Sequence, residues 1–326
     1  MYGNNRVFCE GRFIGGPDVR SCAASFLLIL FPSILWHIFV GPWFAERYSA
    51  AWSLIGIILL LPSLSLLVAS ALTDPGILPR QQDFSECFDW RTGVFRDRQP
   101  PRYSEVVFRG HCIKLKYCTT CNLYRPPRCT HCSVCENCVE RFDHHCPWIG
   151  NCIGRRNYRL FYCFVSFTAL LNLFVLGTST AQVVQLSREL QEIQSLSTGA
   201  SLVQALSEEF ISAALAIYCV GLVWFTVGLW GYHSYLVLTN QTTYEQIKGV
   251  NSESNPYDRG SSGNCADVLC SRVRPRYFNP FTNQLFWPKG SFECAKELSA
   301  RQVSGDLGCN PATIIGIVQK HCGPCG

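Results

Sequence analysis

The sequence predicts an all-α polytopic membrane protein with four transmembrane helices and a cysteine-rich segment between the second and the third. Three observations predict this class. The apolar residues of the 326-residue chain collect in four long runs, the basic residues avoid two of the connecting segments, and the cysteines cluster in the longest connection. Soluble helices and strands would instead carry their apolar residues on one face.

The four apolar runs are each about long enough to cross a ~30 Å hydrocarbon layer as a helix. None of them contains Asp, Glu, Lys or Arg, and Trp or Tyr lies near their ends, as in the aromatic belts of membrane helices. Four such runs are hard to bury as core helices in a protein this small. We therefore expect transmembrane helices within residues 23–40, 50–72, 160–183 and 210–238.

The distribution of Lys and Arg predicts the orientation of the chain. Three lie before the first span, fourteen between the second and the third, and nine after the fourth, whereas the other two connections hold one each. Because basic residues are enriched on the cytosolic side, we expect both termini and the central segment in the cytosol. A basic face beside anionic lipid explains the net charge of +5, which therefore indicates no nucleic-acid partner.

Most of the 20 cysteines would then face a reducing compartment, where metal binding and reactive thiols are commoner than disulfides. Cys322 and Cys325 at the end of the tail suit either a lipidation site or a segment without structure. Mostly polar residues precede the first span, so we expect no cleavable signal peptide. The prediction is a multi-pass protein of an endomembrane, Golgi or vacuole, or of the plasma membrane.

Breaker residues and composition divide the chain into segments. Asp74-Pro75-Gly76 ends the second span, because Pro75 cannot continue a helix and Gly76 permits a turn. We expect an irregular linker over residues 79–110, and the helical spacing of apolar residues over 183–196 predicts a short amphipathic lumenal helix. The expected boundaries are an N-terminal segment 1–22, spans one and two 23–72, a linker 73–115, a cysteine-rich domain 116–158, spans three and four 159–238, a motif-bearing segment 239–270 and a tail 271–326.

The cysteine-rich segment carries eight residues with the spacing of zinc ligands. Zinc binds thiolates and imidazoles tetrahedrally, and a Cys-x2-Cys pair places two thiolates on one tight turn. Spacing alone leaves open which residues share an ion. Metal-free cysteines are the alternative, but so many paired spacings favour metal, which would supply most of the folding energy of so short and polar a segment. The eight residues are Cys118, Cys121, His131, Cys132, Cys135, Cys138, His145 and Cys152.

Cys146 has no place in two four-coordinate metal sites, since those eight residues fill both. His144 lies two residues before it, and Asp143 is beside His144. A thiol, an imidazole and a carboxylate are the parts of an activated nucleophile, in which the imidazole accepts the thiol proton and the carboxylate orients the imidazole. The sequence therefore predicts a catalytic cysteine next to a membrane.

Several motifs resemble those of the DHHC protein S-acyltransferases, or palmitoyltransferases. Asp74-Pro75-Gly76 is similar to the family's DPG element, Thr242-Thr243-Tyr244-Glu245 to its TTxE element, and the stretch that ends at Asn264 to its C-terminal aromatic–glycine–asparagine motif. The resemblance covers about residues 3–270, in the family's order around four spans. Within the cysteine-rich segment it rests on Lys116-Tyr117-Cys118-x2-Cys121, Arg125-Pro126-Pro127-Arg128, His131-Cys132-x2-Cys135-x2-Cys138, Asp143-His144-His145-Cys146-Pro147-Trp148 and Asn151-Cys152-Ile153-Gly154-x2-Asn157.

The resemblance implies a cytosolic two-zinc domain between the second and third spans, with Asp143, His144 and Cys146 as the catalytic group. It also implies that Thr243 contacts the region of the catalytic aspartate and that Asn264 ties the tail to the helices. The implied structural zinc sites are interleaved, with Cys118, Cys121, His131 and Cys138 in one and Cys132, Cys135, His145 and Cys152 in the other. Near Cys146, Arg155 and Arg156 suit either the phosphates of coenzyme A or lipid headgroups.

The implied activity is transfer of a fatty acyl group, most often palmitoyl, from acyl-CoA to accessible cysteines of membrane proteins at the cytosolic face. Cys146 would take the acyl group first and pass it on, in a two-step ping-pong reaction. A catalytically inactive zinc-binding membrane scaffold is the alternative. It explains the ligands and the spans but gives no reason for His144 and Cys146 beside filled metal sites, and an accessory subunit is compatible with either.

Overall fold

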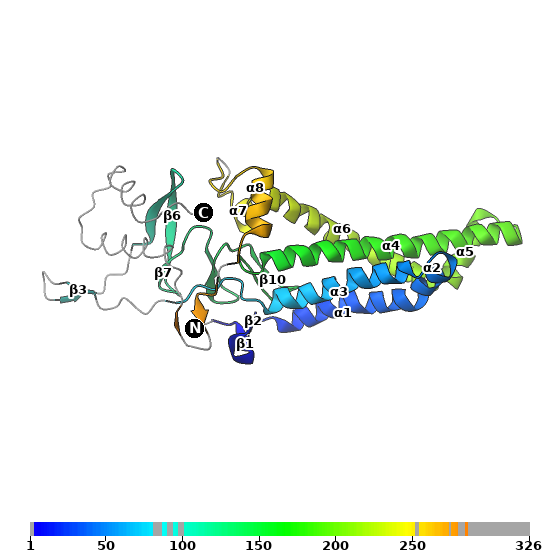
Figure 1. The fold of residues 1–326 in the computed structure, drawn as a ribbon, viewed down its shortest axis with the longest axis horizontal. Coiled ribbons are helices and arrows are strands. Elements are labelled where there is room, and N and C mark those ends of the chain that lie inside the picture. The colour runs from blue at the N-terminus through cyan, green and yellow to red at the C-terminus, as the bar shows by residue number, and fades with distance from the viewer. Residues whose placement is uncertain are drawn as a thin grey trace.

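The computed structural model describes residues 3–80, 87–89, 94–96, 101–251, 254–273, 275–279 and 284–285. Long helices occupy one end of an elongated molecule, and short paired strands occupy the other (Figure 1). Within the described residues, four helical segments are long and apolar enough to cross a membrane, as predicted. The protein is therefore a helical membrane bundle with a cysteine-rich domain at one end.

The first and third spans extend beyond the apolar runs that predict them, whereas the second and fourth match theirs closely. The first consists of α1 (Val19–Leu35), a π-helical turn η2 (Trp36–Val40) and α2 (Gly41–Arg47), and the others are α3 (Ala51–Leu72), α4 (Tyr158–Gln194) and α6 (Phe210–Leu238). Helix α4 packs against both α3 and α6. Large apolar side chains such as Leu61, Ile217 and Trp224 are exposed on the outer faces, as expected of helices whose surroundings are lipid.

Pro32 interrupts the hydrogen bonding of the first span, and a neighbouring helix compensates. Proline has no N–H, so the Leu28 carbonyl loses its helical donor, which would be costly in lipid. The Tyr218 hydroxyl on α6 donates to that carbonyl at 2.8 Å. Beyond the proline, Trp36 Nε1 donates to Thr178 Oγ1 on α4 at 2.8 Å. The first span is therefore joined to both α4 and α6 by side-chain hydrogen bonds.

The short helix predicted over residues 183–196 is not a separate element. Most of it belongs to α4, which continues to Gln194 and ends before Ser195, a residue with φ of 52°. The apolar periodicity was a correct sign of helix, but no Gly or Pro separates it from the span, so the helix continues. A further helix, α5 (Thr198–Glu208), follows, and its Ala205 packs against Val183 and Leu190 of α4.

The prediction of an all-α protein holds for the spans only, because the cysteine-rich end is built from short antiparallel strands. Strands of two or three residues joined by tight metal-ligand turns are too short to show an alternating pattern in the sequence. The pairs are β1 (Arg6–Phe8) with β2 (Phe13–Gly15), β8 (Thr130–Cys132) with β9 (Asn137–Val139), and β10 (His144–Cys146) with β11 (Asn151–Ile153), beside a three-stranded sheet of β5 (Tyr103–Phe108), β6 (His111–Cys118) and β7 (Leu123–Tyr124).

The irregular linker predicted over residues 79–110 is partly strand. Strand β5 pairs with β6 along its whole length, from Phe108 opposite His111 to Tyr103 opposite Lys116. The backbone of β3 (Cys87–Asp89) and β4 (Val94–Arg96) forms a further pair. Residues 81–86, 90–93 and 97–100 lie outside the described residues, as do Cys322 and Cys325.

Short elements after the fourth span return the chain to the cysteine-rich domain. Helix α7 (Thr243–Lys248) begins with a capping box in which Thr242 and Glu245 bond each other's backbone N–H groups, and Gly249 ends it with φ of 61°. The chain continues through α8 (Ser261–Cys265), a π-helical turn η3 (Ala266–Cys270) and the two-residue strands β12 (Phe278–Asn279) and β13 (Gln284–Leu285). Figure 1 shows α7 and α8 beside the end of α6 that adjoins the strands.

Candidate active site and metal centres

Two groups of side chains in the cysteine-rich domain could each hold one metal ion. In each group the histidine Nδ1 lies between 3.4 and 3.8 Å from the three Sγ atoms. A tetrahedral zinc ion, with bonds of about 2.3 Å to sulfur and about 2.0 Å to nitrogen, places such atoms about 3.5 Å apart. Both groups therefore fit a zinc ion. They are Cys118, Cys121, His131 and Cys138 in the first, and Cys132, Cys135, His145 and Cys152 in the second.

Strand register explains why neighbouring ligands in the sequence separate into two groups. His131 on β8 is directly opposite Cys138 on β9, and these two residues share the first group. Successive side chains of a strand point to opposite faces, so Cys132 leaves the group that His131 joins. The pairing that spacing leaves open thus follows from the tertiary structure, and it is the interleaved one that the resemblance implies.

The same alternation along β10 separates a metal ligand from a reactive pair. His145 is opposite Cys152 on β11 and belongs to the second metal group. His144 and Cys146 lie on the other face of this three-residue strand. There Cys146 is buried against the ends of the spans, in a cluster that includes Ala71 of α3 and Phe161 of α4. One strand therefore places His145 in the second metal group and places His144 and Cys146 on its opposite face.

Asp143 is a buried carboxylate that accepts three hydrogen bonds. His144 Nδ1 lies 2.7 Å from its Oδ2, the Thr243 hydroxyl donates to Oδ2 at 2.7 Å, and the Thr243 backbone N–H donates to Oδ1 at 2.9 Å. Burial alone would raise the pKa of Asp143, but the hydrogen bond and the charge of His144 outweigh it and the pKa is lowered. The carboxylate is therefore ionised at neutral pH and holds the imidazole by its Nδ1 side.

His144 is a stronger base than an ordinary histidine. Burial by itself lowers its pKa, but hydrogen bonds to Asp143 and Cys146 raise it to about 9. With Nδ1 bound to the carboxylate, Nε2 is the nitrogen left for a proton exchanged with the thiol. The arrangement can therefore hold a thiolate beside an imidazolium, the reactive form of a cysteine nucleophile.

A buried ion pair positions Thr243 under Asp143. The Arg128 guanidinium binds both carboxylate oxygens of Glu245 at 2.7 Å, and it lies over the Tyr257 ring, 4.3 Å from the ring centre. It also donates to the Asn240 side chain at 2.9 Å and to the Asn240 backbone carbonyl at 3.0 Å. This clamp joins the cysteine-rich domain to α7, which carries Thr243. We found no signal for this ion pair in the sequence beyond the family motifs.

The remaining predicted residues occupy supporting positions. The Asn264 side chain donates to the Leu238 carbonyl at the end of α6 at 2.8 Å, which joins α8 to the fourth span. Arg155 lies 3.4 Å from Glu140 with about a third of its side chain exposed, whereas Arg156 is mostly buried 3.9 Å from Asp74. Of these two arginines, Arg155 is therefore the more accessible to a ligand.

Two residues of the site were missed from the sequence. Asp18 lies before the first span, yet its Oδ2 is 3.1 Å from His145 Nε2, where it can orient this metal ligand. His233 lies on α6 beside His144, with ring centres 5.9 Å apart. A polar residue inside a span was the available signal for His233. Asp18 gave none, because nothing local connects it to His145.

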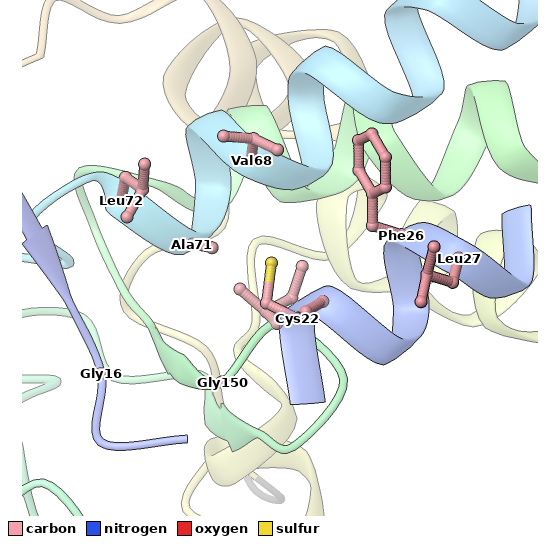
Figure 2. Close-up of a pocket in the computed structure, with 10 residues that line it drawn as sticks. Gly16, Cys22, Phe26, Leu27, Val68, Ala71, Leu72 and Gly150 are labelled. Atoms are coloured by element: carbon pink, nitrogen blue, oxygen red, sulfur yellow. The ribbon is translucent and has the colours of Figure 1, made fainter. Parts of the chain in front are cut away.

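An apolar pocket of about 390 Å³ lies between α1 and α3, and Ile149 and Gly150 line part of it. Figure 2 shows Cys22 and Phe26 of α1, Val68 and Ala71 of α3 and the loop at Gly150 around it. That loop follows Cys146 directly, and the Gly150 N–H donates to the Cys146 carbonyl at 2.8 Å. Gly16 approaches so closely that a Cβ there would be 1.9 Å from the Gly150 carbonyl oxygen. The pocket thus lies between the bundle and the loop that follows the thiol.

Fold and site together define a membrane protein that holds an Asp-His-Cys group beside two groups of three cysteines and one histidine, each of which could hold a metal ion. The model of the DHHC palmitoyltransferase family matches residues 111–250. Protein S-acyltransferase 8 of Arabidopsis thaliana is 40% identical over 287 residues, which cover 84% of this chain and 69% of the relative. Palmitoyltransferase ZDHHC18 of Mus musculus is 40% identical over 286 residues, covering 84% and 72%. The chain belongs to the DHHC palmitoyltransferase family.

Proposed function

We propose that this protein is a protein S-acyltransferase that moves a palmitoyl or similar long-chain acyl group from acyl-CoA to cysteines of protein substrates. Its relatives carry the names of protein S-acyltransferases and palmitoyltransferases over most of both chains. The observation that carries the mechanism is the Asp143–His144–Cys146 group, with its carboxylate buried and its imidazole made basic. A scaffold would need no such group, so we favour the enzyme.

In the first step the Cys146 thiolate, whose proton is held by His144, attacks the carbonyl carbon of the acyl-CoA thioester. The bond from that carbon to the coenzyme A sulfur breaks, and the departing sulfur takes the proton from the His144 imidazolium. Asp143 supports the positive charge and keeps Nδ1 occupied. A thioester on Cys146 and a free coenzyme A thiol result.

In the second step a cysteine of the protein substrate gives its proton to His144 and attacks the same carbonyl carbon. The bond to Cys146 sulfur breaks, and Cys146 recovers a proton from His144. One thioester is exchanged for another in each step, so the reaction is close to thermoneutral and requires no ATP. The same base serves both steps, as in other enzymes with a covalent intermediate.

The two metal groups would hold zinc as a structural ion rather than as a catalyst. Zinc bound there would fix the turns that carry β8 and β10 and supply folding energy to a domain of very short strands. Each site has four protein ligands, which leaves no position for a reactive water. Asp18 would orient His145 toward its ion.

An acyl donor suits the position of the site between membrane and water. At ~0.8 kcal/mol for each buried CH2, keeping a palmitoyl tail out of water is worth roughly 11 kcal/mol. The apolar pocket between α1 and α3 supports entry of such a tail beside the Cys146 loop. Arg155, the more exposed of the two candidate arginines, supports binding of the coenzyme A phosphates. The excess of Lys and Arg on one side supports a cytosolic active site.

The test is acylation of the purified protein in detergent with labelled palmitoyl-CoA, with wild type beside Cys146→Ser. We expect a hydroxylamine-sensitive label on wild type and none on the variant, because a thioester is cleaved by hydroxylamine. Zinc content of two per chain in both proteins is the control for folding. Wild type that holds its metal and takes no label would favour the scaffold, and equal labelling of both proteins would place the acceptor at another cysteine.

A further inference from the structure

His233 brings a second imidazole to the reactive group from inside the membrane bundle. Its ring centre lies 5.9 Å from that of His144, and one nitrogen of each ring and one oxygen of Asp143 lie within 4.8 Å of one another. The residue belongs to α6, whereas Asp143 and His144 belong to the cysteine-rich domain. A contact across these two parts of the molecule places the fourth span at the active site.

The His233 ring is held in one orientation by its neighbours. The Tyr158 hydroxyl, at the start of α4, lies 3.1 Å from His233 Nδ1, so this nitrogen is occupied by a hydrogen bond. Phe161 packs against the ring in a T-shaped pair, with centres 4.9 Å apart and planes at 80°. His233 and Tyr158 are both buried. A buried polar pair of this kind is costly to leave unsatisfied, so each residue fixes the other.

Asp143 alone does not fully fix the position of His144. Its carboxylate holds the ring at Nδ1 only. The face and edge of the ring need packing partners to keep Nε2 directed toward Cys146. Phe161 supplies one, with ring centres 5.4 Å apart and planes at 70°, and His233 supplies the other. Both partners come from the spans.

We propose that His233, itself held by Tyr158, is a positioning residue for His144 in acyl-enzyme formation. This inference rests on the proposed function. His233 keeps the His144 imidazole at the orientation in which Nε2 reaches the thiol, so its loss slows the chemical step. It does not contact the acyl donor in this role, so the acyl-CoA concentration that gives half the maximal rate stays the same.

The experiment compares single-turnover acylation by palmitoyl-CoA in wild type, His233→Phe, His233→Gln and Tyr158→Phe. Phenylalanine keeps a ring but removes the nitrogen that Tyr158 holds, so the ring loses its fixed orientation against His144. We expect the maximal rate to fall about tenfold or more, as misplacement of a catalytic group does. Glutamine keeps a polar group for Tyr158 and should restore part of the rate. Tyr158→Phe removes only the hydroxyl and should give an intermediate loss. In all variants the half-saturating acyl-CoA concentration should change by less than about twofold.

His37→Gln is the matched control, because this histidine lies in η2 of the first span, where its Nδ1 contacts the Ser33 carbonyl at 2.8 Å. The His37→Gln variant should become acylated at the same rate as wild type. A content of two zinc ions per chain shows that a variant is folded. Equal maximal rates in wild type, His233→Phe and Tyr158→Phe would overturn the positioning role. So would variants that raise only the half-saturating acyl-CoA concentration and keep the maximal rate. If His233→Phe fails to fold, the other two variants decide. Absence of label on wild type would instead contradict the proposed function itself.

Discussion

Asp143 and His144 show how burial and hydrogen bonds set the chemistry of single residues. The carboxylate is ionised inside the protein because three donors satisfy it, and that negative charge in turn favours the imidazolium. The folded protein raises the pKa of His144 to about 9, above the ordinary value of 6.5. The imidazolium is thus present through neutral pH and is lost as the pH rises through about 9.

We predict that acyl-enzyme formation declines above a pH of about 9, because a neutral His144 has no proton for the departing coenzyme A sulfur. Asp143→Asn removes the charge that supports the imidazolium, so its decline should begin at a lower pH. The measurement is the initial rate of labelling between about pH 6 and pH 10, corrected for hydrolysis of acyl-CoA. A decline at the same pH in both proteins would show that Asp143 does not control the basicity of His144.

At the scale of elements, the clamp from Arg128 to Glu245 connects α7 to the cysteine-rich domain. Both side chains are nearly inaccessible to water, and the pair holds the helix whose first residue, Thr243, bonds Asp143. A buried ion pair contributes little net stability, but removal of one member leaves an unpaired charge in the interior. The geometry of the active site therefore depends on a contact outside it.

We predict that Glu245→Gln lowers the free energy of unfolding by about 3 kcal/mol and reduces acylation as α7 loosens. Thermal unfolding in detergent and palmitoyl-CoA labelling measure the two effects. Glu189→Gln is the matched control, because Glu189 pairs with Arg47 at an exposed site, where loss of the pair costs about 0–1 kcal/mol. Equal destabilisation by both changes would show that burial of the Arg128–Glu245 pair does not increase the cost of its loss.

At the scale of the whole molecule, the two ends have different sources of stability. The helices bury apolar faces against one another and present apolar faces to lipid. Apart from β5 and β6, the cysteine-rich domain consists of strands of two or three residues around its metal groups. Such strands cannot bury enough surface to fold by themselves. The domain should depend on metal and the bundle should not.

We predict that a strong zinc chelator abolishes acylation while the helical signal of the spans remains. Far-ultraviolet circular dichroism and palmitoyl-CoA labelling of the same detergent sample check this, with added zinc expected to restore labelling. Retention of full activity after both ions are removed would contradict a structural role for the metals. Loss of the helical signal along with the metals would show that the bundle depends on the cysteine-rich domain.

The sequence by itself determined the features that local patterns encode. Uninterrupted apolar runs predict four spans because a membrane helix must be apolar along its whole length, and the structure contains them. The Cys-x2-Cys spacings predict metal ligands, and the surplus of Cys146 beside His144 singles out a thiol. These inferences need only residues that are neighbours in the chain. They missed the strands between the ligands, which are too short to carry a pattern.

Only the tertiary structure decided the contacts between distant segments. It divided the eight ligands into two groups through strand register, and it brought Thr243 to Asp143, Asp18 to His145 and His233 to His144. Each of these pairs is separated by about a hundred residues. Their meeting depends on how the spans pack and where the chain returns to the cysteine-rich domain. Local composition carries no record of that packing; the family resemblance alone pointed to the ligand grouping and to the contact of Thr243, and nothing in the sequence pointed to those of Asp18 and His233.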